Sequence, residues 1–294
     1  MATIFISIAS YKDEELVNTI KDIISNAEHP DNLRFGICFQ DEPDNIKKLD
    51  EYINDKRFKI INVHYNETKG CCWARSIIQK LYDNETYTLQ LDSHHRFVKN
   101  WDTLLINMFL DLKKDGVDKP LITTYLPSYN PANDPQDRVM CPWSIRLDKV
   151  IENNILLFIP DYIMNHKELT KPIKGDFFSG HFSFTSGNFC NEIPYDDNLY
   201  FIGEEINISL RSYTHGYEIY YPHILVAWHE YTRTYRTKHW DDDKEWWKTD
   251  QKSKQYFTLF LNNDKSVEEK FKLGKVKDIT TYPHYNLLYN TINI

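Results

Sequence analysis

The chain has 294 residues, of which 41% are hydrophobic and 27% are charged, with a formal net charge of −8. This composition is typical of a globular protein and excludes a mainly disordered chain. The length predicts one large α/β core with a smaller appended segment. The negative charge and the lack of any Lys/Arg run argue against nucleic-acid binding, because neutralising phosphates requires a basic face.

Hydropathy and cysteine usage both bear on the cellular setting. No segment approaches eighteen consecutive apolar residues, and the first residues lack the basic region and the longer apolar run of a signal peptide. The five cysteines are an odd number without metal-site spacing, so we interpret them as reduced thiols that pack in the core. We therefore expect a cytoplasmic protein with no membrane insertion.

The first 125 residues alternate strand patterns with helix patterns. Residues 3–8 are apolar and β-branched, and a helical pattern follows them behind the capping signal Ser10-x-x-Asp13. Further strands are predicted at 33–39, 58–63 and 87–91, and further helices at 46–53, 73–81 and 104–112. This alternation predicts an α/β fold with a Rossmann-like, mainly parallel central sheet, helices on both faces and a ligand crevice beyond the carboxyl ends of the strands.

The second half begins with a long loop at residues 127–142, which is rich in Pro, Asn and Asp. After it the patterns predict a loop entering a strand at 176–185, a helix at 204–213, a strand at 224–228, and helices at 245–261 and 267–273. We expect residues 1–240 to form one domain, with residues 241–294 as a helical extension packed on it.

The segment LQLDSHHRF, residues 89–97, places Asp92 and His94 just past an apolar strand. In extended backbone, residues i and i+2 point to the same side, so this carboxylate and imidazole can share one cation. A solvated strand end is the simpler interpretation of any isolated Asp-x-His sequence, but ligands of open α/β sheets bind at this edge. Such a mixed site with open positions suits Mn²⁺, with Mg²⁺ as the alternative, and the cation would stabilise a departing diphosphate.

Three later features can complete this site. His229 ends the next apolar run and alone carries little weight, while Arg233 adds a cation suited to a phosphate oxygen. Glu204 and Glu205 open a predicted helix, where the helix dipole favours negative charge and where capping alone is the simpler role. Gly203 allows close approach of the backbone, and Gly180, which precedes His181, supplies a second glycine at the same region.

Four motifs together carry a resemblance. They are FISIASYKDEEL at 5–16, LDSHHRF at 91–97, GEEI followed by RSYTHGY at 203–217, and WHEYTR at 228–233. Their order is similar to that of the polypeptide α-N-acetylglucosaminyltransferases, which include the cytosolic enzyme that modifies hydroxyproline. The resemblance spans residues 3–275 and extends distantly to the polypeptide N-acetylgalactosaminyltransferases. It implies a GT-A glycosyltransferase fold, with a nucleotide-binding half at 1–125 and a sugar and acceptor half at 126–240.

The resemblance also implies roles for individual residues. It implies that the metal ligands are Asp92, His94 and His229. Residues near the uridine would be Ser10, Tyr11 and Asp13, for which helix capping is the alternative role of Ser10 and Asp13. The remaining donor contacts would be Arg75, Asp92, Ser93, Gly180, His181 and Arg233, and the catalytic candidates Arg75, Glu204 and Glu205.

The activity implied is a retaining, Mn²⁺-dependent transfer of GlcNAc from UDP-GlcNAc to a Ser, Thr or hydroxyproline hydroxyl of a polypeptide. The alternatives are transfer of glucose or GalNAc from another UDP-sugar to a glycan acceptor, or an inactive homologue that only binds the sugar nucleotide. Sugar selection does not carry over from the galactosaminyl enzymes, which have a tryptophan and two glycines where this chain has Phe201, Ile202 and Gly203. Tyr125, Tyr129 and Trp143 are candidate peptide contacts, or simply pack the loop onto the sheet.

Overall fold

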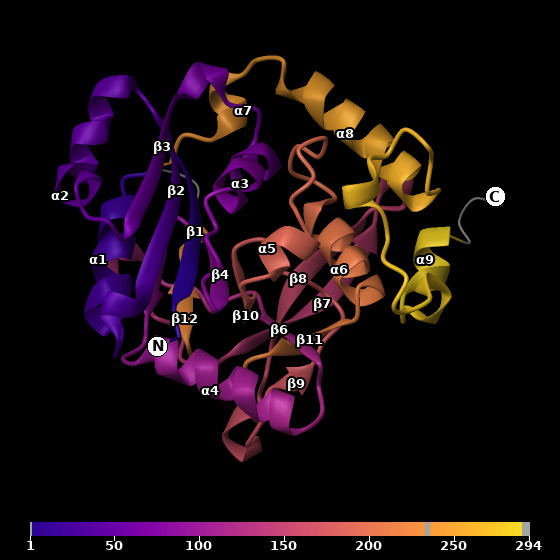
Figure 1. Ribbon diagram of the computed structural model, residues 1–294, viewed down its shortest axis with the longest axis horizontal. Helices are drawn as coiled ribbons and strands as arrows, with labels where there is room; N and C mark the ends of the chain where they lie inside the picture. The colour runs from indigo at the N-terminus through magenta and orange to yellow at the C-terminus, as the bar shows by residue number, and fades with distance from the viewer. Residues whose placement is uncertain (1, 233–235, 290–294) are drawn as a thin grey trace.

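A computed structural model describes residues 2–232 and 236–289 of the chain. Within this part, eight strands form one central sheet in the order β3-β2-β1-β4-β10-β6-β11-β9 (Figure 1). The strands are β1 Ile4–Tyr11, β2 Leu33–Asp41, β3 Phe58–His64, β4 Tyr87–Asp92, β6 Lys119–Thr123, β9 Ile173–Lys174, β10 Phe182–Ser186 and β11 Tyr217–Tyr221. Pairing is parallel from β3 to β4 and between β6 and β11, whereas β10 and β9 run antiparallel to their neighbours. The predicted mainly parallel α/β sheet is thus confirmed.

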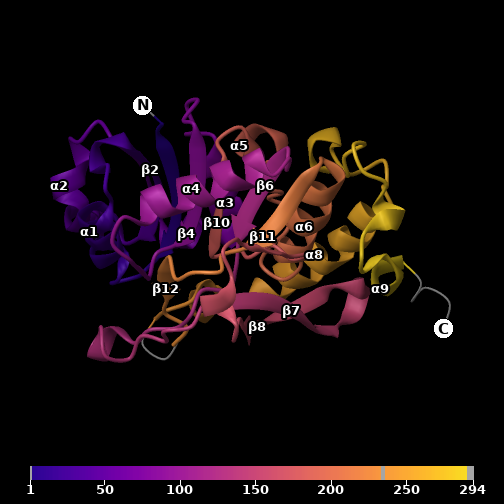
Figure 2. The same ribbon diagram turned by 90° about the horizontal axis from the view of Figure 1, so that it is seen from below.

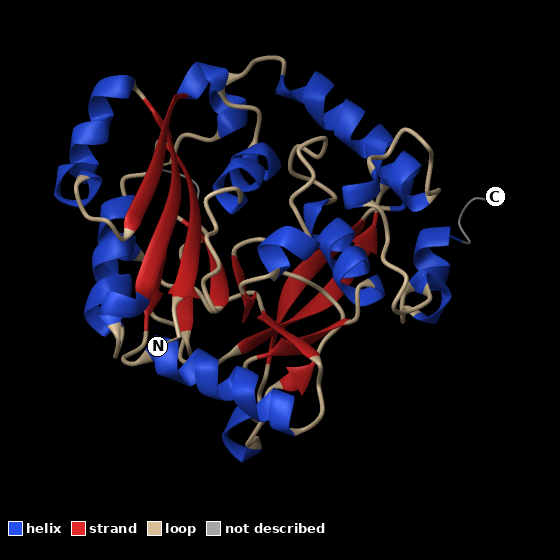
Figure 3. Ribbon diagram, viewed as in Figure 1, coloured by secondary structure: helices blue, strands red, loops and turns tan. Residues whose placement is uncertain are grey.

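Helices cover both faces of the sheet, as predicted (Figure 3). Ile4, Ile6 and Ile8 of β1 pack into the same core as α1 (Leu16–Asn26). Phe5, between them in sequence, packs on the opposite face against α3 (Cys71–Gln79). Alternate side chains of a strand point to opposite faces, so β1 is apolar on both. In Figure 1, α1 and α3 accordingly lie on opposite sides of β1 and β2.

A second core joins the later elements. It contains residues from β11, from α6 (Glu204–Thr214) and from α8 (Trp246–Leu261), together with the hairpin of β7 (Trp143–Val150) and β8 (Leu156–Tyr162). Figure 2 shows this hairpin along one side of the molecule, and its turn contacts α8 and α9 (Tyr285–Tyr289). The C-terminal segment therefore packs on the same core, although the domain boundary at residue 240 stays a prediction.

Some predicted elements differ from those observed. The helix expected at 46–53 is a 3-10 segment, Pro43–Leu49, followed by the short α2, Asp50–Ile53. The helix expected at 267–273 is reduced to a 3-10 turn, Glu269–Phe271. Apolar periodicity alone does not distinguish these tighter turns from α-helix, and the hairpin of β7 and β8 was not predicted at all.

The capping role predicted for Ser10 was wrong. Its hydroxyl is buried and has no hydrogen-bond partner in the described chain. Asp13 instead accepts a hydrogen bond from the backbone N–H of Glu15 at 2.9 Å, just ahead of α1. Asp13 is thereby held at the carboxyl end of β1, beside the ends of β2 and β4.

Two short strands bring a distant segment to this edge. β12 (Ala227–His229) pairs antiparallel with β5 (His95–Phe97), so that His229 lies opposite His95. The strand expected at 224–228 thus starts later and includes the histidine. The remaining helices are α4 (Trp101–Lys114), α5 (Phe189–Glu192) and α7 (His239–Asp242). No helix of the described residues has the length and apolar character to cross a membrane.

Candidate functional site

Asp92, His94 and His229 converge at the carboxyl edge of the sheet. One side-chain ligand atom from each lies within 4.8 Å of the other two. Asp92 Oδ2 is 3.7 Å from His94 Nε2 and 3.5 Å from His229 Nε2. Asp92 is the last residue of β4, and His229 reaches it through the pairing of β12 with β5. The three residues that the sequence predicted as ligands therefore occupy one place.

Asp13 orients the His94 ring. Its Oδ2 lies 2.7 Å from His94 Nδ1 and accepts a hydrogen bond from the Ser93 hydroxyl at 2.7 Å. Burial raises the pKa of the Asp13 carboxyl, but the contacts with His94 and Ser93 outweigh burial and hold that pKa below its ordinary value. An ionised Asp13 places the ring proton on Nδ1 and leaves the Nε2 lone pair toward Asp92, as in carboxylate–histidine–metal arrangements.

His229 is buried and has ring nitrogens available to bind a metal ion. Its ring is 6% exposed, and neither ring nitrogen has a well-formed hydrogen bond within the described residues. Burial, reinforced by the neighbouring His181, lowers the pKa of His229 well below its ordinary value. The ring is therefore neutral, which is the form that binds a metal. One carboxylate and two imidazoles with open positions fit a divalent cation such as Mn²⁺.

Arg236 lies directly against this group. Its Nη1 is 2.5 Å from His94 Nδ1 and 2.7 Å from His94 Nε2, and its Nε is 3.0 Å from Glu230 Oε2. The guanidinium thus places positive charge against both ring nitrogens, including the Nε2 atom that a cation would use. A cation bound by the three residues requires Arg236 to move away from His94. Arg233, the other cation predicted here, lies outside the described residues.

Arg75 links Asp92 to the start of α6. Its Nη2 donates to Asp92 Oδ1 at 2.6 Å, and its Nη1 donates to Glu204 Oε1, which also accepts from the Tyr195 hydroxyl at 2.8 Å. Gly180 makes this pairing possible, because a Cβ there would lie 2.9 Å from both Arg75 Nη1 and Glu204 Oε1. Glu204 is therefore the partner of a buried arginine, a role beyond helix capping.

Glu205 is held by two other donors. Its Oε1 accepts from the Gly180 N–H at 2.9 Å and its Oε2 from the Tyr125 hydroxyl at 2.6 Å. Burial raises the pKa of Glu205 to about 7. His181 is buried beside it, and burial lowers the pKa of its ring to about 3. Because His181 Nε2 accepts from the Leu126 N–H at 3.1 Å, this histidine is engaged by the backbone and does not join Asp92, His94 and His229 as a candidate ligand.

Two cavities meet at Asp92, Arg75 and His229. The first has a volume of about 170 Å³, and among its lining residues are Tyr11, Asp13, Cys71, Ser93, Arg236 and Trp240. The second has a volume of about 390 Å³, and among its lining residues are Tyr125, Lys149, Gly180, His181, Glu204 and Glu205. Ser10 lines neither of them. Adjacent cavities that share charged residues suit a ligand in two parts, joined at the shared residues.

Several contributors were missed or misjudged at the sequence level. Gln90 donates to the Tyr195 hydroxyl at 2.6 Å and so supports Glu204. A buried glutamine inside an apolar strand was the available signal, because such a group needs a partner. Of the predicted peptide contacts, Tyr125 lines the second cavity, whereas Tyr129 and Trp143 line neither of the two cavities and are 3% and 7% exposed.

Comparison with known families identifies the family of the chain. The sequence profile of the family described as Glycosyltransferase (GlcNAc) matches residues 3–49 and 42–285. The chain belongs to this glycosyltransferase family. No curated protein matches it in sequence. The match extends across β1, the metal group and α6, so all described site residues lie inside it.

Solved structures support the GT-A fold of this family member. A crystal structure of GalNAc-T7 with UDP, GalNAc and Mn²⁺ is similar with a TM-score of 0.62 and 17% identity, over 98% of this chain and 57% of that one. S. aureus TarS 1-349 in complex with UDP-GlcNAc is similar with a TM-score of 0.53 and 11% identity, over 99% of this chain and 72% of that one. This chain thus spans little more than half the length of GalNAc-T7.

Proposed function

We propose that this protein is a glycosyltransferase that moves GlcNAc from UDP-GlcNAc to a hydroxyl group, with a divalent cation held by Asp92, His94 and His229. The observation that carries the proposal is this convergent group, tied by Arg75 to Glu204 across two adjoining cavities. The family match supports the reaction class. GlcNAc in the family description and UDP-GlcNAc in the TarS crystal support the donor.

The chain's own residues divide the work between the two cavities. Tyr11, Asp13 and Ser93 are on the side of the first cavity, which we assign to the nucleotide. Glu204 and Glu205 are on the side of the second, which we assign to the sugar and the acceptor. Mn²⁺, present in the GalNAc-T7 crystal, would neutralise charge on the leaving diphosphate. Arg75 at the junction of the two cavities and Arg236 in the first cavity supply positive charge near the place where negative charge develops on the leaving diphosphate.

For the acceptor we propose a polypeptide hydroxyl of Ser, Thr or hydroxyproline, with retention of the anomeric configuration, as the resemblance implies. Tyr125 and the hairpin residues around Lys149 border the second cavity and give an extended chain both apolar and polar contacts. A glycan acceptor is the competing proposal. We also propose a cytoplasmic setting, which the five unpaired cysteines support.

The test is UDP release from UDP-GlcNAc, UDP-GalNAc and UDP-glucose, with Mn²⁺, with Mg²⁺ and with EDTA. We expect release with UDP-GlcNAc and Mn²⁺, stimulated by hydroxyl-bearing peptides and abolished by EDTA. Release only with another donor would overturn the GlcNAc assignment, and stimulation by saccharides alone would overturn the polypeptide acceptor. Binding of UDP-sugars without any release, whatever the acceptor, would favour the inactive homologue.

A further inference from the structure

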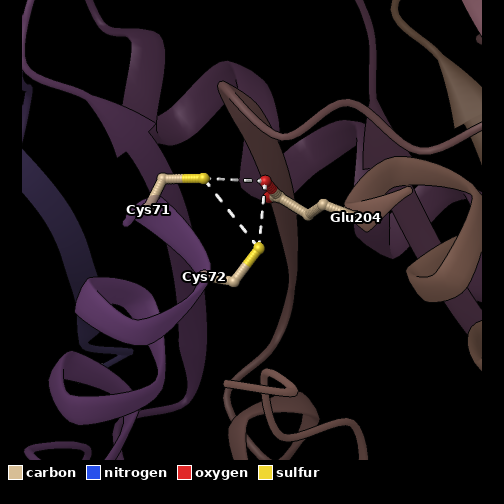
Figure 4. Close-up of side chains that lie close together, drawn as sticks. All are labelled: Cys71, Cys72 and Glu204. Atoms are coloured by element: carbon tan, nitrogen blue, oxygen red, sulfur yellow. Dashed lines mark hydrogen bonds between the residues drawn. The ribbon is translucent and has the colours of Figure 1, made fainter. Parts of the chain in front are cut away.

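A second group of metal-ligating atoms lies beside the proposed transferase site. Cys71 and Cys72 open α3, and both thiols face Glu204 at the start of α6 (Figure 4). Cys71 Sγ and Cys72 Sγ are 3.9 Å apart, and they lie 3.3 Å and 3.7 Å from Glu204 Oε2. Two helices remote in sequence thus direct three ligand atoms at one point.

These separations match a zinc tetrahedron. With Zn–S near 2.3 Å and Zn–O near 2.0 Å, tetrahedral angles place two sulfurs about 3.8 Å apart and each sulfur about 3.5 Å from the oxygen. The observed distances of 3.9, 3.3 and 3.7 Å lie within a few tenths of an ångström of these values. Only small side-chain rotations are needed for all three atoms to reach one ion.

Glu204 presents one oxygen to this point without a strong partner. Its Oε1 is taken by Arg75 and Tyr195, whereas the contacts of Oε2 in the described residues are the two thiols. Thiols are weak hydrogen-bond donors, so a buried carboxylate oxygen is poorly satisfied by them. A metal ion would satisfy it fully.

We propose that Cys71, Cys72 and Glu204 form a second metal site, which takes a thiophilic divalent cation such as Zn²⁺. Each cysteine loses its thiol proton to solvent and binds as a thiolate, and Glu204 binds through Oε2. Cys71 lines the first cavity, which leaves the fourth position accessible to water. Both cysteines also pack in or against the second core, as the sequence predicted, and the proposal adds a ligand role to that packing.

The two metal sites differ in chemistry and share a neighbour. Thiolates select soft ions such as Zn²⁺ and Cd²⁺, while the carboxylate and imidazoles of the Asp92 group also suit Mn²⁺. Arg75 contacts both Asp92 and Glu204, so a cation on Glu204 weakens the hold of that carboxylate on Arg75. We therefore expect Zn²⁺ at the thiol site to inhibit transfer. This inhibition rests on the proposed function, whereas the binding of Zn²⁺ does not depend on it.

The test is a Cd²⁺ titration of the full chain under a phosphine reductant, followed by thiolate-to-cadmium charge-transfer absorption. We expect one Cd²⁺ per chain with this absorption, displaced by Zn²⁺ and lost in Cys71→Ser and Cys72→Ser. Cys141→Ser is the matched control, because that partly buried thiol contacts only backbone carbonyls in the described chain. His229→Ala should keep the signal, which separates this site from the Asp92 group.

Absence of charge-transfer absorption in the wild-type protein, or its persistence in both serine variants, would overturn the proposal. If a serine variant fails to fold, as judged by circular dichroism, alkylation of the wild-type protein tests the metal site instead. Zn²⁺ should protect Cys71 from maleimide, mapped by mass spectrometry, while Cys141 reacts equally with and without the ion. Equal labelling of Cys71 under both conditions would refute the site, independently of whether any UDP-sugar is turned over.

Discussion

The Asp13→Asn substitution tests whether the proposed metal site requires an oriented His94. Asp13 Oδ1 accepts from the Glu15 N–H at 2.9 Å, while Oδ2 receives the Ser93 hydroxyl and faces His94 Nδ1 at 2.7 Å. An asparagine keeps the first contact only if its carbonyl replaces Oδ1. Its NH₂ group then faces His94 Nδ1 and forces the ring proton onto Nε2, the atom that should bind the cation.

The opposite amide orientation does not rescue the site, because it would set the NH₂ group against the Glu15 N–H. Loss of such an orienting partner costs about 10–100-fold in metal affinity. This corresponds to about 1.4–2.8 kcal/mol. We therefore expect the dissociation constant for Mn²⁺, measured by electron paramagnetic resonance in the presence of UDP, to rise by that factor.

Asp41→Asn is the matched control for this measurement. Asp41 is a buried carboxylate at the end of β2 that accepts from the Glu42 N–H at 2.8 Å and from Asn45 at 2.9 Å, away from His94. The Asp41→Asn substitution should leave the Mn²⁺ affinity unchanged. An Asp13→Asn protein that binds Mn²⁺ as tightly as the wild type would refute the orienting role, and equal losses in both variants would point to a general effect on the fold.

Three further predictions concern the second cavity and the third ligand. Gly180→Ala should lower kcat/KM by about 10²-fold, because its Cβ displaces Arg75 and Glu204 from positions 2.9 Å away, and urea unfolding should show that the protein remains folded. Glu205→Gln should reduce the pH dependence of stability. The folded pKa of about 7 lies above the ordinary value, so wild-type stability should fall as pH rises from about 5 to 7, which urea unfolding across that range would show. His229→Ala should remove Mn²⁺-dependent UDP release while circular dichroism stays unchanged; persistent Mn²⁺ activation would exclude His229 as a ligand.

The first half of the sheet and the position of Asp92 and His94 at its edge were predictable from sequence, for physical reasons. Strands such as β1 are apolar on both faces, and Asp92 with His94 follows such a strand at the edge where parallel strands present their ligands. Both signals are local. The placement of His229 was harder to foresee, because it depends on the pairing of β12 with β5 across more than a hundred residues, and the family resemblance supplied it.

The remaining contacts could not be read from the sequence because they join side chains that are distant along it. Nothing near Glu204 indicates that Arg75 and Tyr195 meet its Oε1, or that two thiols meet its Oε2. The hairpin that borders the second cavity carries no Asn-Gly or Asp-Gly turn, and its turn instead uses Asn153 and Asn154 with positive φ. Tertiary packing decides such features.

The balance of buried charge around the metal group predicts that a cation and the nucleotide bind together. Among the described residues, the ion pairs here join four carboxylates, Asp13, Asp92, Glu204 and Glu230, to two guanidiniums, Arg75 and Arg236. A diphosphate entering this excess of negative charge meets repulsion, which weak screening in a buried site makes worth several kcal/mol. A divalent cation on Asp92 offsets the excess and binds the phosphate oxygens directly.

Calorimetry should therefore find UDP binding at least about tenfold tighter with Mn²⁺ than with EDTA, since even 1.4 kcal/mol corresponds to that factor. In His229→Ala this difference should disappear, and UDP affinity that is equal with and without the cation in the wild type would show that Arg236 and Arg75 hold the nucleotide on their own.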